Sequence, residues 1–158
     1  YKNSVSIITM ETYTVTVNDK KWIEWRNSGG KLHRKDGPAF EYADGSTEWY
    51  VDGKRHREDG PAVEFAGGFK CWYVDGKRHR EDGPAVEYPN GSAEWYVDGK
   101  RHREDGPAVE YASGTKEWYV DGKNLTQEQF LAHTKPKQAS FAGKVVEIDG
   151  KKYKLVEV

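Results

Sequence analysis

Short runs of alternating apolar and polar residues recur along this chain at a fixed interval. Residues 94–97 (EWYV) form a β-prone run, and Asp98 with Gly99 follows as a dipeptide that favours the tight turn of a β-hairpin. A second β-prone run at residues 108–111 (AVEY) leads through a turn at Gly114 into the next tryptophan. The interval is 23 residues, a period that chance does not produce. The repeating tryptophans are Trp49, Trp72, Trp95 and Trp118.

This period predicts an all-β fold, an elongated sheet or solenoid of tandem β-hairpins. A lone two-stranded hairpin is marginal in water, so each unit must pack on its neighbours. Two strands at their usual spacing advance the array by roughly 10 Å per unit. We expect repeats over residues 26–123, a hairpin cap over 1–25, and a second cap over 124–158. In the second cap, Thr126 and Gln129 form a capping-box pattern before a short helix at about 127–133, and a hairpin follows within 141–158.

The alternation also suggests which side chains share a face of the sheet, because neighbouring residues in a strand point to opposite faces. Trp95 and Val97 share one face, and Tyr96 lies on the other. We expect Val109 to join the tryptophan side as the core, which leaves Glu110 beside Tyr96 on an open face. A change of register by one residue would exchange these assignments.

The open face is the predicted partner-binding surface. Tyrosine offers rigid amphipathic contact area, and aromatic residues are enriched at interface hot spots. The carboxylates between the tyrosines would favour a basic partner. The alternative, that Tyr and Glu simply suit a solvated sheet face, stays open. The predicted partner face comprises Tyr50, Tyr73, Tyr96, Tyr119, Glu64, Glu87 and Glu110.

Charge gives a weaker second candidate, a basic edge along the loops. The chain is 32% charged with a formal net charge of −1, so no global field favours nucleic acid. Neighbouring Glu and Asp residues cancel much of the loop charge, and we do not expect a nucleic-acid partner. The arginines of this edge are Arg55, Arg57, Arg78, Arg80, Arg101 and Arg103.

Catalytic and metal chemistry find little support in the residues. Matched histidines roughly 10 Å apart cannot share one ion, and polar residues copied in every unit do not make a single catalytic constellation. We expect no catalytic residue, metal or cofactor. The repeated loop HRxDGPA is interpreted as structural, with Arg57 or His56 bonding Asp59 or nearby carbonyl groups. Cys71 stands where other units have Glu, and we interpret it as a drifted surface position rather than a nucleophile.

Cysteine usage and hydropathy bear on location. Cys71 is the only cysteine, which excludes an internal disulfide and favours an intracellular setting. No stretch approaches the roughly 18 apolar residues that span a bilayer, and no signal peptide is visible. We expect a cytoplasmic protein, and a homodimer formed through exposed sheet edges stays open.

Residues 52–56 (DGKRH) and 42–46 (YADGS) resemble the MORN repeat, a 23-residue β-hairpin unit, over residues 22–123. The HRxDGPA variant also resembles repeats in uncharacterised proteins of bacteriophages and large DNA viruses. The resemblance implies a scaffold or binding surface. We therefore expect a non-enzymatic protein–protein interaction module, and specifically a small viral protein that binds and inhibits a host factor, in the context of antiviral defence. The alternative is a repeat protein that binds a carbohydrate or a small ligand of the choline type.

Overall fold

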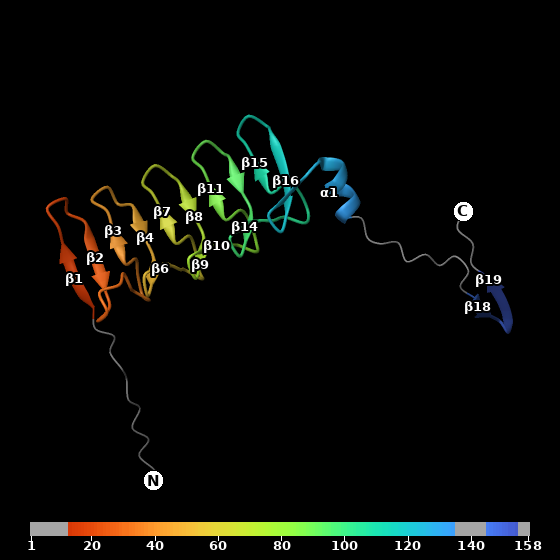
Figure 1. The fold of residues 1–158 in the computed structure, drawn as a ribbon, viewed down its shortest axis with the longest axis horizontal. Coiled ribbons are helices and arrows are strands. Elements are labelled where there is room, and N and C mark those ends of the chain that lie inside the picture. The colour runs from red at the N-terminus through yellow and green to blue at the C-terminus, as the bar shows by residue number, and fades with distance from the viewer. Residues whose placement is uncertain (1–12, 135–144, 155–158) are drawn as a thin grey trace, which may run out of the picture.

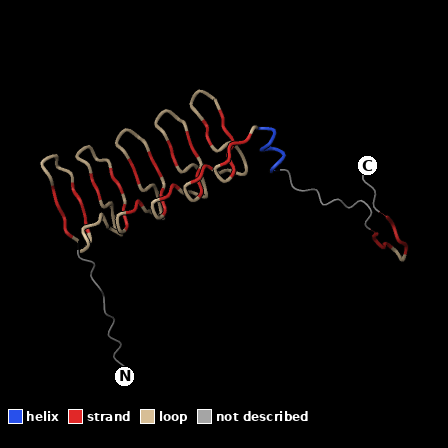
Figure 2. The backbone as a smooth tube through the Cα atoms, in the orientation of Figure 1, coloured by secondary structure: helices blue, strands red, loops and turns tan. Residues whose placement is uncertain are grey.

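A long antiparallel sheet forms the body of the protein. The computed structural model describes residues 13–134 and 145–154. Within residues 13–134, eleven strands lie side by side in the order β1-β2-β3-β4-β7-β8-β11-β12-β15-β16-β17, as the rungs in Figures 1 and 2 show. The all-β array of tandem hairpins is therefore confirmed. The strands are β1 Thr14–Val17, β2 Ile23–Arg26, β3 Phe40–Glu41, β4 Thr47–Glu48, β7 Val63–Glu64, β8 Lys70–Cys71, β11 Val86–Glu87, β12 Ala93–Glu94, β15 Val109–Glu110, β16 Lys116–Val120 and β17 Lys123–Leu125.

A second row of small hairpins runs along one edge of this sheet (Figure 2). The turn of each hairpin holds an Asp and a Gly at positive φ, as at Asp98 (50°) and Gly99 (81°), which is the geometry of a type I′ turn. Hydrogen bonds from Arg80 N to Tyr96 O (3.1 Å) and from Gly99 N to Arg78 O (2.8 Å) join neighbouring hairpins into a ladder. The hairpins are β5 Tyr50–Val51 with β6 Lys54–Arg55, β9 Tyr73–Val74 with β10 Lys77–Arg78, and β13 Tyr96–Val97 with β14 Lys100–Arg101.

The chain bends at the repeated tryptophan, where the sequence predicts one continuous strand. Glu94 ends β12 in the main sheet, and Tyr96 begins β13 in the small hairpin. Trp95 lies at the bend, and its backbone N–H donates to Ala108 O at 2.8 Å. The reason is that each unit serves two ladders, the main sheet and the hairpin row, and the strand must leave one to enter the other. In the last unit the run continues unbroken as β16.

The predicted assignment of the two faces is wrong. Glu94 lies directly opposite Val86 on β11 and Val109 on β15, so both valines share its side of the sheet. Both valines are buried. Five residues separate β11 from β12, and Tyr88 N donates to Ser92 O at 3.0 Å to close a turn over residues 89–91, which places Gly91 at φ 86°. This turn, rather than the matching of apolar residues between strands, fixes the register. The core therefore lies on the Glu/Tyr side, and the tryptophans lie on the opposite side.

The C-terminal cap begins as the capping box predicts. Helix α1 (Gln127–Thr134) is preceded by Thr126, whose Oγ1 accepts from Gln129 N at 3.1 Å while Gln129 Oε1 accepts from Thr126 N at 2.9 Å. The helix packs against β16 and β17 and buries Phe130. A separate hairpin pairs β18 (Val145–Ile148) with β19 (Lys151–Lys154). The remainder of that predicted hairpin, at 141–144 and 155–158, and the start of the N-terminal cap, at 1–12, lie outside the described residues.

Candidate functional site

A buried carboxylate organises the interior of the units. Glu94 Oε1 accepts a hydrogen bond from Tyr88 Oη at 2.8 Å, and Glu94 Oε2 accepts from Tyr96 Oη at 2.7 Å and from Arg101 Nη2 at 3.1 Å. Its side chain is only 10% exposed. Burial alone would raise the pKa of Glu94, but the bonds from Tyr96 and Tyr88 and the charge on Arg101 outweigh burial and lower it.

The same interior network occurs two units earlier. Glu48 accepts from Tyr42 Oη (2.7 Å), Tyr50 Oη (2.7 Å) and Arg55 Nε (2.9 Å). Burial and the bond to Glu48 raise the pKa of Tyr42 and of Tyr50 to about 12. These tyrosines and arginines are thus held in a structural network rather than presented to a partner.

One unit departs from this network at two positions together. Cys71 replaces the carboxylate, and Phe65 replaces the tyrosine whose hydroxyl would bond it. The expectation that Cys71 lies at the surface is wrong: it is 1% exposed, because its strand position points into the core between Val63 and Val86. Burial raises the pKa of the Cys71 thiol, which disfavours the thiolate that a nucleophile needs.

On the opposite side, each HRxDGPA loop folds its arginine back over a tryptophan. The guanidinium carbon of Arg80 lies 4.0 Å from the ring centroid of Trp72. Arg80 Nε donates to Asp82 Oδ1 at 2.8 Å, and Nη1 donates to Pro84 O at 3.2 Å and to Glu87 Oε1 at 2.9 Å. Arg57 makes the matching bonds to Asp59 and Pro61, so the structural interpretation of this loop is confirmed.

Local contacts also explain why each loop contains a glycine and a histidine. A Cβ at Gly60 would lie 2.9 Å from the guanidinium carbon of Arg57, so only glycine leaves room for that fold-back. His79 Nδ1 accepts the backbone N–H of Asp98 at 3.2 Å, and this bond ties the loop to the next unit's turn.

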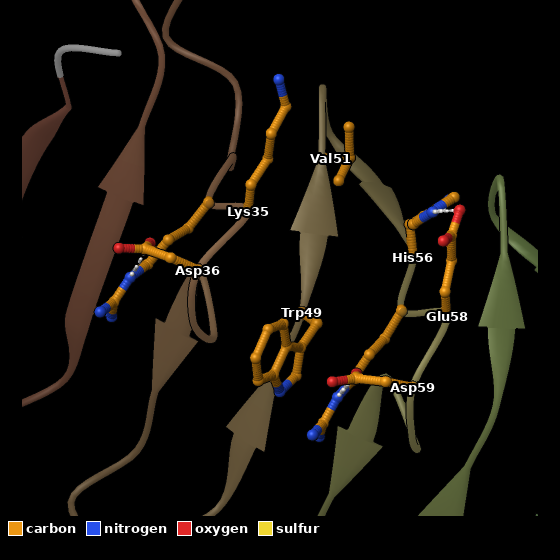
Figure 3. A pocket seen from close by; sticks show the side chains of 9 residues that line it. Lys35, Asp36, Trp49, Val51, His56, Glu58 and Asp59 are labelled. Carbon is orange, nitrogen blue, oxygen red and sulfur yellow. Dashed lines mark hydrogen bonds and ion pairs between the residues drawn. The ribbon is translucent and has the colours of Figure 1, made fainter. Parts of the chain in front are cut away.

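Successive loops flank three equivalent cavities of about 610 Å³ each, which are open to solvent on one side. The first groove contains Trp49 and Val51, the second Trp72 and Val74, and the third Trp95 and Val97. In the first groove, Trp49 lies between the two loops that wall it (Figure 3). Neighbouring grooves share a wall: the loop with Arg57, Glu58 and Asp59 lines both the first and the second groove. We call these three cavities the groove row.

The structure does not bring the predicted partner face together. Its tyrosines lie on the core side, where Tyr96 is buried and Tyr73 packs against the core. Its glutamates lie on the tryptophan side, where Glu87 and Glu110 accept from Arg80 and Arg103 at 2.9 and 3.1 Å. The register described above is the reason, since it places each valine rather than each following glutamate beside the tyrosines.

The predicted basic edge is divided in the same way. Arg55 and Arg101 bond the interior carboxylates, and Arg78 lies over the ring of Tyr96 on that side. The loop arginines, such as Arg80, are mostly covered by their own tryptophan contact. Carboxylates therefore dominate the exposed rim of the loops: the Glu81 side chain is 87% exposed.

The groove row was not identified from the sequence, although a signal for it was present. Trp72 and Val74 recur in every central unit at a spacing of two residues, and this pair is equally consistent with a core face. Only the register, which depends on the turn, distinguishes a groove floor from a core.

Comparisons add no family to this geometry: a scan against models of known protein families finds no match, and neither does a search of curated proteins. The MORN-like resemblance stays a prediction. Within the described residues, no three His, Cys, Asp or Glu side chains gather as a metal site. In the same part of the chain, no helix is long and apolar enough to cross a membrane.

Proposed function

We propose that this chain is a non-enzymatic protein-binding scaffold and that its partner lies along the groove row. The observation that carries the proposal is the repetition of one cavity three times, with the same residue types, on one side of the array. A catalytic site is a single asymmetric arrangement, whereas a row of equal cavities suits a long partner that makes the same contact several times.

A small ligand of the choline type is the alternative, and the composition of the cavities disfavours it. A quaternary ammonium cage needs several aromatic faces around one cation. Trp72 is the only Trp, Tyr or Phe in the second groove, and Arg80 already lies over its ring at 4.0 Å. Apart from Val74, Pro61 and Gly60, the remaining lining is polar or charged, and this mixture suits segments of a protein chain.

The expectation that this chain is a viral protein and that its partner is a host factor rests on the sequence resemblance alone and stays a prediction. The same holds for a cytoplasmic location. The absence of catalysis likewise stays a prediction, and the buried thiol of Cys71 supports it by removing one candidate nucleophile.

Differential capture tests the proposal. Glu81→Lys reverses a charge that lines both the second and third grooves, and Glu128→Lys makes the same change on exposed α1. Circular dichroism would first verify that both variants keep the wild-type fold. We expect a protein that wild type and Glu128→Lys retain from a cell lysate to be lost by Glu81→Lys.

A photo-reactive residue at position 81, with the same residue at 128 as the control, locates the contact. Cross-linking of the captured protein at 81 alone supports the proposal. Capture that is equal for wild type and Glu81→Lys, with no cross-link at 81, overturns it.

A further inference from the structure

Each cavity of the groove row combines an apolar floor with an acidic rim. Trp72 and Val74 provide the floor of the second groove. Glu81 and Asp82 stand at its rim with side chains 87% and 82% exposed. A lysine side chain matches this arrangement, because its methylene stem packs on apolar surface while its ammonium group stays at the solvent boundary.

The charges of the cavities favour a cation. The second groove sets two arginines against four carboxylates, and so does the third. The arginines are also engaged: Arg80 is bonded to Asp82 and Glu87 and lies over Trp72. The ring of Trp72 already faces the guanidinium of Arg80, so an incoming ammonium group pairs better with the carboxylates. The ring then packs against the methylene stem of the lysine.

The spacing of the cavities selects the backbone of the occupant. Two strands per unit place neighbouring grooves about 9.6 Å apart. A polyproline II helix presents the same side every third residue, at about 9.3 Å. A β-strand repeats its side at about 6.7 or 13 Å, and an α-helix does so every seventh residue at about 10.5 Å, so the helix overshoots by about 2 Å over three grooves.

We infer that the groove row binds an extended, proline-rich segment in the polyproline II conformation that carries a lysine at every third position. This inference rests on the proposed function and adds to it the chemistry of the partner. One lysine enters each groove, and the prolines between them pass over the loop that separates two grooves.

The first groove differs from the other two in one charged residue, and this difference predicts which groove binds lysine most weakly. Lys35 takes the place that Glu58, Glu81 and Glu104 hold in later loops. The first groove therefore sets three basic side chains against three carboxylates. It should be the weakest of the three for lysine, and Lys35→Glu should make it equal to the others.

Peptide titration by calorimetry at low ionic strength tests the inference on the full chain. The probe has three Lys-Pro-Pro triplets. One control has the same lysines separated by three prolines, a second has Gln in place of Lys, and a third is a helical peptide with Lys at every seventh residue. We expect the triplet peptide to bind about tenfold more tightly than each control, from ion pairing and stem packing at successive grooves.

Charge variants of the protein test the same inference with the peptide held constant. Glu81→Gln should weaken the triplet peptide about fivefold, Lys35→Glu should strengthen it by a similar factor, and Glu128→Gln should leave it unchanged. Added salt should reduce all of these differences, since the rim is exposed.

The outcomes separate this inference from the proposed function. Equal affinity for both lysine spacings, for the glutamine peptide or for the helical peptide overturns the inference. If no peptide binds while the captured protein is still lost by Glu81→Lys, the partner chemistry is wrong and the proposed function stands. If capture is equal for wild type and Glu81→Lys and no cross-link forms at position 81, the proposed function falls as well.

Discussion

The interior carboxylate network makes a quantitative prediction, because the chain itself contains a unit that lacks it. Glu94→Cys copies the residue that the preceding unit has at Cys71, and Tyr88→Phe copies Phe65. Glu94→Cys alone removes the acceptor of bonds from Tyr88, Tyr96 and Arg101. Tyr88→Phe alone removes one of these bonds.

The cost of each change follows from its partners. Breaking a buried ion pair destabilises proteins by about 3–5 kcal/mol, and Arg101 is one-third exposed, so we expect about 3 kcal/mol for Glu94→Cys. A hydrogen bond to a charged group contributes about 1.5 kcal/mol at the low end, which is our value for Tyr88→Phe. Both changes remove the same Tyr88–Glu94 bond, so the double variant should cost about 3 kcal/mol rather than about 4.5 kcal/mol.

Urea unfolding under reducing conditions, followed by tryptophan fluorescence, measures the free energy of unfolding of the four proteins. Glu117→Cys is the matched control, because Glu117 occupies the same place in the last unit with its side chain 32% exposed. We expect a cost of about 1 kcal/mol there. Equal costs at Glu94 and Glu117, or strict additivity of Tyr88→Phe and Glu94→Cys, would refute the network as the source of stability.

Three further results follow from the same contacts. Burial and the bonds to buried carboxylates raise the pKa of Tyr42 and Tyr88 to about 12, so an ultraviolet titration should show phenolate forming well above the usual pH. Because these folded-state pKa values are raised, the stabilising contribution of Tyr42 and Tyr88 is complete below about pH 10 and is lost as pH rises towards 12. Phenolate formation at pH 10 that disappears in Tyr42→Phe or Tyr88→Phe would contradict this. The pKa of Glu94 is lowered in the fold, so its contribution is present above about pH 4 and is lost as pH falls through the folded value; acid unfolding of Glu94→Gln should show a shallower pH dependence than wild type. Gly60→Ala would place a Cβ 2.9 Å from the guanidinium carbon of Arg57 and displace it, costing about 1 kcal/mol and changing tryptophan fluorescence; an unchanged spectrum would show that the stack does not depend on this glycine.

The repeat and the local elements could be predicted from residues, and the side chains that face each other across strands could not. The Asp98–Gly99 turn and the Thr126–Gln129 capping box are local patterns, and both occur as predicted. The face assignment required the register between strands. A three-residue turn ending in Gly91 sets that register, whereas matching the apolar residues of neighbouring strands favoured the wrong face.

The same limit applied to the candidate sites. The arginines at 55 and 57 are two residues apart and look like one basic cluster in the sequence. In the fold the first bonds the interior Glu48 and the second lies over Trp49 on the outer side. Strand β6 ends at Arg55, so Arg57 already belongs to the loop that follows, and no local sequence pattern predicts that boundary.

Comparison of the units with one another distinguishes residues that the fold explains from those that it leaves to a ligand. The stack of Arg80 on Trp72 and the bond to Asp82 account for the recurrence of all three residue types. In the interior, where residues serve only contacts within the fold, a change at one position is matched at its partner. Cys71 replaces the carboxylate, and Phe65 replaces the tyrosine whose hydroxyl would bond it. Glu81 fits neither case: its side chain is 87% exposed, and its ion-pair contact with His79 Nε2 spans 3.8 Å. An exposed pair at that distance contributes little to stability, yet the same Glu recurs at the rim of the second and third grooves. The proposed cationic partner in the groove row would account for this glutamate, for which the contacts within the fold give no reason.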